Sequence, residues 1–534
     1  MARDAPPLDA VAGVSEAALS ARREAANASN RPWDLGDEVA GHADVRRAEV
    51  AAARRAARAS GSDLGQILIH RRIASEGTVA SARARLENVP LLDLTARPPA
   101  PDLLAAIGPW RALELGVVPW RRVGRTTVLA APTAEAYEAA LPTLSQVFEA
   151  PRFAIAAAGA IAAATHAGQE HALVSRAEAR VAPSDSIRSL VLHGWPDAAL
   201  ICAALLIFAL CTVPGALLIA LTAWALLTLA ATVALKAAAL CATMGAKAPP
   251  PAPPEALPRM TILVALYKET DIAGHLVARL RRLSYPRERL EVLLVTESDD
   301  ATTHATLAAT RLPPWMAEIT VPPGHVKTKP RALNYALDHC TGEFIGVYDA
   351  EDAPEPDQLL KIAAHFAATG EDVACLQGRL DFYNARANWL SRCFAMEYAA
   401  WFRVILPGLA RLGLPVPLGG TTLFFRAKTL RALGGWDAHN VTEDADLGLR
   451  LVRRGWRTEL ADTVTFEEAN CRFWPWVKQR SRWLKGYAVT YTVHMRDPRA
   501  LWRDLGAWGF LGVQILFVGT LSQFLLVPLL LSFW

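Results

Sequence analysis

The feature that most constrains this chain is a long stretch without any charged side chain. It runs for 38 residues, from Ala198 to Leu235. As one straight helix it would be about 57 Å long, nearly twice the hydrocarbon core of a bilayer. Because Pro214-Gly215 divides the stretch, the sequence predicts a transmembrane hairpin over residues 196–245. A second uncharged run, from Phe510 to Trp534, predicts a further transmembrane helix within residues 505–534.

Arginines precede both apolar regions and predict their orientation. Segments rich in arginine next to a membrane span stay on the cytoplasmic side. A two-helix hairpin returns the chain to the side from which it entered, so residues 246–504 should face the cytoplasm together with the N-terminal part. The arginines are Arg176, Arg180 and Arg188 before the hairpin, and Arg496, Arg499 and Arg503 before the last run.

Composition excludes some classes of protein. A chain of 534 residues has room for two to four domains. The net charge of only +4, without a basic block or zinc-type spacing, gives no sign of a nucleic-acid partner. The seven cysteines are scattered, which is typical of a reducing cytosol rather than of a disulfide framework.

Shifts in composition divide the rest of the chain. Residues 1–45 are rich in Ala, Asp and Arg without a clear period, which predicts a mobile arm. Residues 46–168 combine helical apolar spacing with a hairpin pattern and predict a compact domain, which residues 169–195 should link to the membrane. Residues 246–258, AKAPPPAPPEALP, predict a semi-rigid Pro-rich linker.

Strand-like runs alternate with helical patterns between residues 259 and 504. The strand-like runs lie at 260–266, 290–296 and 342–350, and helices are expected over 272–283, 330–339 and 357–368. This alternation is typical of an α/β fold with a doubly wound, mostly parallel sheet. Such sheets bind ligands at the carboxyl ends of their strands.

Polar and acidic residues follow each of three expected strands. The segments are Tyr267-Lys268-Glu269, Glu297-Ser298-Asp299-Asp300 and Asp349-Ala350-Glu351-Asp352. A solvated turn would explain any one of them. Together they would repel one another in one crevice unless a cation or the donor groups of a ligand were present. A hard divalent ion bound through oxygen atoms, together with phosphates, fits this set.

Two later segments add further polar groups. Thr442-Glu443-Asp444 opens an amphipathic helical pattern, where Thr442 could also serve as a simple helix cap. Gln479, Arg482 and Trp483 are spaced to share one helix face, which would also suit a helix anchored at a membrane interface. Residues 386–406 mix aromatic and charged residues and predict either an interfacial helix or a core helix.

Taken in this order, the D-x-E, T-E-D and Q-x-x-R-W segments resemble the family 2 glycosyltransferases. The resemblance covers residues 258 to about 534 and is closest to membrane-embedded processive synthases, such as cellulose and hyaluronan synthases. It implies a GT-A-like fold and an inverting, metal-dependent hexosyltransferase. Such an enzyme would transfer a sugar from a nucleotide-diphosphate sugar to a growing glycan.

The resemblance also implies residue roles. Asp349 and Glu351 would hold Mg²⁺ or Mn²⁺, with Asp352 as a substitute ligand. Tyr267, Glu269, Glu297, Asp299 and Asp349 would contact the donor, with Asp300 a rival of Glu297 and Asp299, and Lys329 would neutralise the diphosphate. Asp444 would be the catalytic base beside Glu443. The acceptor and diphosphate site would comprise Glu443, Gln479, Arg482 and Trp483, in which Arg482 would contact the diphosphate and Trp483 would stack on the acceptor sugar.

Residues 60–168 bear a second resemblance, to the N-terminal domain of type II secretion and pilus assembly ATPases. Some such domains bind cyclic di-GMP through an R-L-G-x-x-L-V-x-x-G pattern. Here Asp63 stands in place of the leading Arg, and Arg72 in place of the closing Gly. We therefore expect a regulatory or docking domain that does not bind cyclic di-GMP tightly and that acts through a protein partner or by docking against its own catalytic domain.

The apolar runs and the family resemblance together imply a multi-pass protein of the bacterial inner membrane that synthesises an exopolysaccharide, with or without exporting it. Similar synthases carry several spans after the Q-x-x-R-W helix, so we expect the natural chain to continue beyond Trp534. One alternative is a non-processive transferase that acts on a lipid carrier. Another is a non-catalytic membrane scaffold or receptor that keeps the fold.

Overall fold

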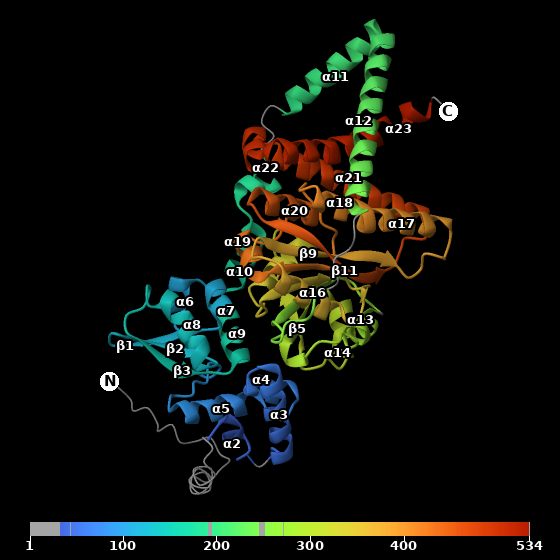
Figure 1. The fold of residues 1–534 in the computed structure, drawn as a ribbon. Coiled ribbons are helices and arrows are strands. Elements are labelled where there is room, and N and C mark those ends of the chain that lie inside the picture. Colours follow the sequence, from blue (N-terminus) through green and yellow to red (C-terminus); the bar gives the residue numbers. More distant parts are fainter. Residues whose placement is uncertain (1–32, 43, 191–194, 245–250, 271, 533–534) are drawn as a thin grey trace. The chain divides into compact units, whose positions relative to one another are not determined.

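The computed structural model describes residues 33–42, 44–190, 195–244, 251–270 and 272–532 (Figure 1). The chain forms two compact units. The first comprises Met1–Leu173, Pro286–Glu291 and Pro313–Ala317, and the second comprises Val174–Tyr285, Val292–Leu312 and Glu318–Trp534. The predicted binding residues all belong to the second unit, which we call the catalytic unit.

The N-terminal unit has a helical part and a small α/β part, each with its own apolar core. The helical part contains α2 (Leu35–Val39), α3 (Arg47–Ser60), α4 (Leu64–His70) and α5 (Glu76–Glu87). The α/β part contains α6 (Pro101–Ile107), α7 (Pro109–Leu115), β1 (Val118–Val123), β2 (Thr126–Ala131), α8 (Ala134–Leu144), β3 (Pro151–Ile155) and α9 (Ala158–His166). The predicted hairpin is confirmed, because β1 and β2 pair antiparallel. The strand β3 adds in parallel to β2.

The mobile arm predicted over residues 1–45 is wrong for its last part. Asp34 and Asp37 form a reciprocal capping box at the start of α2. Leu35 and Val39 are buried in the helical core of the N-terminal unit. A five-residue helix is too short to show a period, so the sequence pattern could not reveal it. Residues 1–32 and 43 lie outside the described residues.

The catalytic unit is built on an eight-stranded mixed sheet with the order β6-β5-β4-β7-β10-β9-β11-β8. Its strands are β4 (Met260–Leu266), β5 (Leu290–Glu297), β6 (Met316–Val321), β7 (Phe344–Tyr348), β8 (Ala353–Pro354), β9 (Val373–Phe382), β10 (Leu423–Arg426) and β11 (Arg457–Glu467). β4 and β7 pair in parallel, as do β9 and β11. β10 is antiparallel to both of its neighbours, and β8 is antiparallel to β11. The predicted α/β class is therefore confirmed, but the sheet is mixed.

Helices of the catalytic unit follow the predicted alternation. They are α13 (Ile272–Leu280), α14 (Ala301–Ala308), α15 (Lys329–Leu337), α16 (Gln358–Ala368), α17 (Trp389–Ala400), α18 (Leu406–Arg411), α19 (Ala427–Ala432) and α20 (Glu443–Arg453). The almost entirely buried strand β7 sits between β4 and β10, which explains its continuous apolar run. In α17, Leu390 and Phe394 are buried whereas Trp389 and Met396 are exposed, so this helix has both a core face and an outer apolar face.

The segment predicted as a linker over residues 169–195 contains α10 (Glu170–Ala179) and two short 3₁₀ turns, Pro183–Asp185 and Ile187–Ser189. The helices α11 (Trp195–Thr212) and α12 (Pro214–Thr243) follow, and they meet at the predicted Pro214. At the C-terminal end lie α21 (Phe473–His494), α22 (Pro498–Val513), a π-helical segment (Gln514–Gly519) and α23 (Thr520–Leu531). Gly506 interrupts α22 with φ 66° and ψ 176°.

Within the described residues, two helical segments are long and apolar enough to cross a membrane. They are Pro214–Thr243 and Pro498–Leu529. Only 11% of the most apolar window of Pro214–Thr243 is buried in the protein, which is unusual for a core helix of a soluble domain. The apolar part of α11, Ala203–Thr212, is shorter. Length and composition thus permit two spans, whereas the sequence predicted three.

Candidate active site

Asp349 and Lys329 meet at the end of β7. Asp349 follows the last residue of this strand, and Lys329 is the first residue of α15. The Nζ atom of Lys329 forms an ion pair with Asp349 and donates a hydrogen bond to the carbonyl of Gly420 at 2.9 Å. Burial lowers the pKa of Lys329, but the nearby carboxylates of Asp349 and Glu443 outweigh it and raise the pKa overall. The predicted metal ligand, Asp349, and the predicted diphosphate-binding lysine, Lys329, are therefore in direct contact.

Asp352 orients the loop that carries Asp349. Its carboxylate is fully buried and accepts hydrogen bonds from the backbone N–H of Asp349, at 2.9 Å, and from the hydroxyl of Thr421. Burial, together with the charge of Asp349, raises the pKa of Asp352 well above its usual range. Asp352 therefore supports the loop from beneath, which leaves Asp349 and Glu351 as the candidate metal ligands.

A cluster of carboxyl groups surrounds Asp349. Burial and the charges of Asp349 and Glu269 raise the pKa of Glu351 to about 7, although the residue as a whole lies at the exposed edge of the loop. Burial and the neighbouring charges of Asp352 and Asp349 raise the pKa of Glu467 well above its usual range. Burial and the charges of Asp300 and Asp349 raise that of Glu269. The positive charges nearby are therefore too few to balance the negative charges of these carboxyl groups.

This donor set fits a hard divalent cation, because it consists of carboxylate oxygens whose mutual repulsion a cation would relieve. Among the described residues, no group of three His, Cys, Asp or Glu side chains is close enough to cage a metal ion. Magnesium is commonly held by one or two carboxylates together with substrate phosphates. Asp349 and Glu351 would be the two protein ligands of such a site, and the substrate phosphates would supply further ligands.

Glu443 and Asp444 begin α20 and lie close to Lys329. Burial raises the pKa of Asp444 to about 6, although the backbone N–H of Ala445 and the charge of Lys329 oppose the shift. Burial and the charge of Asp444 raise the pKa of Glu443 to about 8. Thr442 occupies the N-cap position but makes no side-chain capping bond, so the simple capping role weighed for it is wrong. Its hydroxyl instead lies 3.3 Å from that of Thr490 on α21.

A second group of polar residues follows β4 and β5. The Nζ atom of Lys327 lies 4.6 Å from the centroid of the Tyr267 ring and 2.6 and 2.7 Å from the two carboxylate oxygens of Asp299. Tyr267 is 47% exposed. Tyr267 and Asp299 thus stay accessible to a ligand.

Glu297 and Asp300 are placed differently from Asp299. Glu297 is buried and forms an ion pair of 2.5 Å with Arg331, which is also buried. Asp300 caps α14 through Thr303 and accepts a hydrogen bond from the backbone N–H of Lys268 at 2.5 Å. These placements favour structural roles for both residues over the direct donor contact predicted for Glu297.

The predicted acceptor residues lie on α21. Gln479 accepts a hydrogen bond from Asn470 at 2.8 Å, and Arg482 is exposed. The centroid of the Trp483 ring lies 6.2 Å from the ring centroid of Phe394 and 6.5 Å from that of Tyr398, both on α17. An added Cβ at Gly486 would lie 2.6 Å from the Thr442 hydroxyl, so this glycine lets α21 approach the start of α20.

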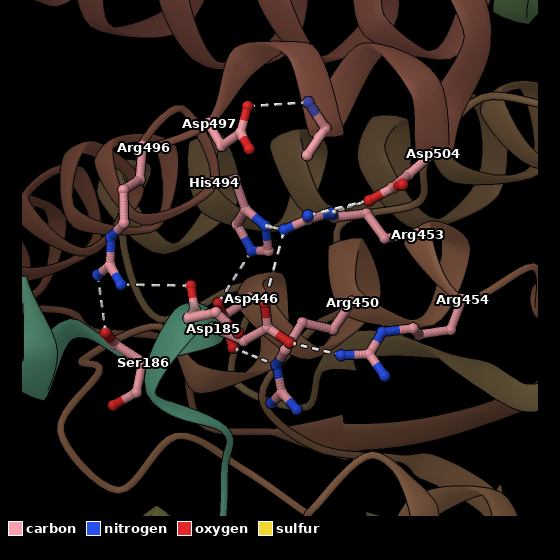
Figure 2. Close-up of polar contacts among 12 residues, drawn as sticks. Asp185, Ser186, Asp446, Arg450, Arg453, Arg454, His494, Arg496, Asp497 and Asp504 are labelled. Carbon is pink, nitrogen blue, oxygen red and sulfur yellow. Dashed lines mark hydrogen bonds and ion pairs between the residues drawn. The ribbon is translucent and has the colours of Figure 1, made fainter.

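A buried polar network fixes α20 against α21 (Figure 2). Asp446 accepts hydrogen bonds from Arg450 at 2.7 Å and pairs with His494 at 3.0 Å. The guanidinium of Arg453 lies 3.0 Å from the other ring nitrogen of His494 and binds Asp504 on α22. The helix that carries Asp444 is therefore held by the same helix that carries Trp483.

Sequence reasoning missed several groups at this site. Glu467 ends β11 and belongs to the acidic cluster, and the only signal for it is the Glu467-Glu468 pair after an apolar strand. The Gly420 carbonyl and the Thr421 hydroxyl contact Lys329 and Asp352. The Gly-Gly-Thr-Thr run before β10 signals a tight turn at most, and it gives no hint of these partners.

Comparison with known proteins agrees with this geometry. Residues 344–534 match the family model described as "Glycosyl transferase family group 2". This part of the chain is therefore similar to the glycosyltransferases that the family model describes. A "Beta-monoglucosyldiacylglycerol synthase" of Synechocystis is 28% identical over 273 residues, which are 48% of this chain and 55% of that protein. The chain spans about half the length of the curated relatives that it matches first.

Two solved structures are each similar to part of the chain. A mannosyltransferase, PcManGT from Pyrobaculum calidifontis in complex with GDP-Man and Mn²⁺, is 21% identical with a TM-score of 0.47. The match covers 59% of this chain and 86% of that chain. A structure of MshE with cdg is 24% identical with a TM-score of 0.23, and the match covers 25% of this chain and 98% of that chain.

Proposed function

We propose that this chain is a membrane-attached, inverting glycosyltransferase that uses a nucleotide-diphosphate sugar and extends a polysaccharide. The observation that carries the proposal is that Lys329, Asp349 and the Glu443-Asp444 pair lie close together. A cation for phosphates, carboxylates for a divalent metal and a separate buried carboxylate are what such a transfer requires. A non-catalytic scaffold would have no need to keep so many repelling carboxylates together.

In the proposed reaction, the acceptor hydroxyl attacks the anomeric carbon of the donor sugar from the face opposite the nucleotide. Asp444 takes the proton of that hydroxyl, since a carboxylate with a pKa of about 6 is ionised at pH 7 and more basic than an ordinary aspartate. Lys329 and Arg482 would bind the departing diphosphate. Mg²⁺ or Mn²⁺, held by Asp349 and Glu351, would stabilise the negative charge of the leaving group.

Trp483 supports a polymer acceptor, because an indole stacks well on the apolar face of a sugar ring. Its packing against Phe394 and Tyr398 would fix the ring at the end of an aromatic cluster. The proposal places the protein in the bacterial inner membrane with both units in the cytoplasm. The arginines that precede both apolar regions support that placement, with α11 and α12 crossing together as the hairpin that returns the chain to the cytoplasm.

A second candidate function is transfer of a single sugar to a lipid. The similarity to a glucosyldiacylglycerol synthase favours it, and exposed Trp389, Trp474 and Trp502 would suit access from a membrane surface. Product size separates the two functions. Isolated membranes that contain the protein are incubated with labelled nucleotide sugars and Mn²⁺, and the products are extracted and sized. We expect a long water-soluble polymer. A product with one sugar on a lipid would favour the second function, and no transfer from any donor would contradict both.

A further inference from the structure

The segment before the membrane hairpin packs onto the catalytic unit. We call residues 174–190 the strap. The strap lies outside the residues that match the glycosyltransferase family model. Nevertheless, it contributes a buried carboxylate, Glu178, with only 7% of its surface exposed. A buried carboxylate is costly unless it is paired and hydrogen-bonded, so its partners indicate what it does.

Glu178 holds the loop that leads to Lys327 and Lys329. Its Oε1 atom accepts hydrogen bonds from the backbone N–H groups of His325 at 2.6 Å and Val326 at 3.2 Å. The same oxygen lies 3.8 Å from Arg331, the partner of Glu297. Lys327, which binds Asp299, follows Val326 directly. Lys329, which binds Asp349, begins α15 two positions later.

Gly324 shows how closely the loop fits the strap. A Cβ atom added at Gly324 would overlap the Glu178 carboxylate and the Arg331 guanidinium, and would lie 2.8 Å from Val174. A side chain at position 324 would therefore displace the neighbouring side chains. The loop is therefore pressed against Glu178, and its position depends on where that carboxylate lies.

The strap also supports α15, the helix that begins with Lys329. Asn334 of α15 donates a hydrogen bond to the carbonyl of Ala177 at 2.9 Å. Asp338, at the C-terminal end of α15, pairs with Arg180 and with Arg176. Strap contacts thus run from the loop before α15 to the end of this helix.

The far end of the strap is anchored independently of Glu178 (Figure 2). Asp185 accepts a hydrogen bond at 2.8 Å from Arg454, the residue that follows α20. Arg496, just after α21, donates to the carbonyl of Ser186 at 3.0 Å. Loss of the Glu178 carboxylate should therefore release the loop at 324–328 without detaching the strap.

We infer that Glu178 is a positioning residue for donor binding and that the strap is a working part of the catalytic unit. The inference rests on the proposed function, because it assigns to Glu178 the task of placing Lys327 and Lys329 for the nucleotide diphosphate. The hydrogen bonds that one carboxylate oxygen accepts from the backbone keep the loop, and with it both ammonium groups, beside Asp299 and Asp349.

Nucleotide binding tests this role separately from sugar transfer. The full chain is purified in detergent, and the affinities for UDP, GDP, ADP, CDP and dTDP with Mn²⁺ are measured by calorimetry. Glu178→Ala should weaken the binding of the preferred nucleotide at least about tenfold, because two hydrogen bonds to a charged group are lost. Glu178→Gln, which keeps an acceptor oxygen, should fall between wild type and Glu178→Ala. Glu170→Ala, an exposed position on the same helix, is the matched control and should bind like wild type.

The outcomes separate the inference from the proposed function. A wild-type chain that binds none of the five nucleotides would overturn both. If the wild type binds a nucleotide and Glu178→Ala binds it equally well, only the inference fails. Should Glu178→Ala not fold, Glu178→Gln decides, since wild-type affinity would overturn the inference and weaker affinity would support it. With the natural donor, the Glu178 variants should raise KM more than they lower kcat, whereas a mere loss of folded protein would lower kcat alone.

Discussion

At the scale of single residues, the base assigned to Asp444 makes a prediction about pH. Burial raises the pKa of this carboxyl group to about 6. A general base must be deprotonated, so the rate of transfer should be full above that pKa and should fall about tenfold per pH unit below it. A pH–rate profile at saturating donor, measured between pH 4.5 and 8, checks this. An acid limb near pH 4, the value of an ordinary aspartate, would contradict the burial of the base.

The family resemblance implied that Asp349, Lys329 and Asp444 share one site, and the structure brings them together. The resemblance could not rank Asp352 against Glu351, because both follow the same strand and carry the same charge. Only the fold shows that Asp352 turns inward to the Asp349 backbone and to Thr421. Likewise, the pairing of Glu297 with Arg331 joins residues 34 positions apart, which no local pattern predicts.

At the scale of elements, α21 joins the acceptor residues to the start of α20. Replacement of Trp483 by Ala should suppress polymer formation and leave donor hydrolysis as the residual reaction, because the stacking surface for the acceptor sugar is lost. Product sizing together with a nucleotide-release assay measures both. Trp474→Ala, at a 68% exposed position of the same helix, is the matched control. Normal polymer from Trp483→Ala would show that the indole only packs against α17.

The sequence predicted helices and strands correctly where an apolar pattern was long or where a proline marked its end. The strands β4, β5 and β7 and the break between α11 and α12 at Pro214 lie where expected. The four-residue strand β10 was missed, since a short LFFR run carries too little signal. The strap was expected as a linker because its anchors are single side chains such as Glu178 and Asp185, whose partners lie far away in the sequence.

At the scale of the whole molecule, the N-terminal unit carries its own apolar cores. Asp63 caps α4 and pairs with Arg83 at 2.5 Å, and Arg72 has a left-handed backbone with φ 55°. A negative charge where the resembling pattern has Arg, and a side chain where it has Gly, both oppose the approach of a cyclic dinucleotide. We therefore expect no tight binding of cyclic di-GMP by the full chain. Titration calorimetry checks this, and a Kd at or below about 1 μM would contradict it.

The central claim is that the protein transfers a sugar, with Asp444 as the base and Asp349 as part of the donor site. The most direct test compares wild type, Asp444→Asn and Asp349→Ala in two assays, Mn²⁺-dependent nucleotide binding and transfer from the labelled donor. Asp444→Asn should bind the nucleotide like wild type but lose at least about 100-fold in transfer rate, since the amide keeps the shape and cannot take the proton. Asp349→Ala should lose Mn²⁺-dependent binding itself. Transfer by Asp444→Asn at more than about a tenth of the wild-type rate would contradict the account.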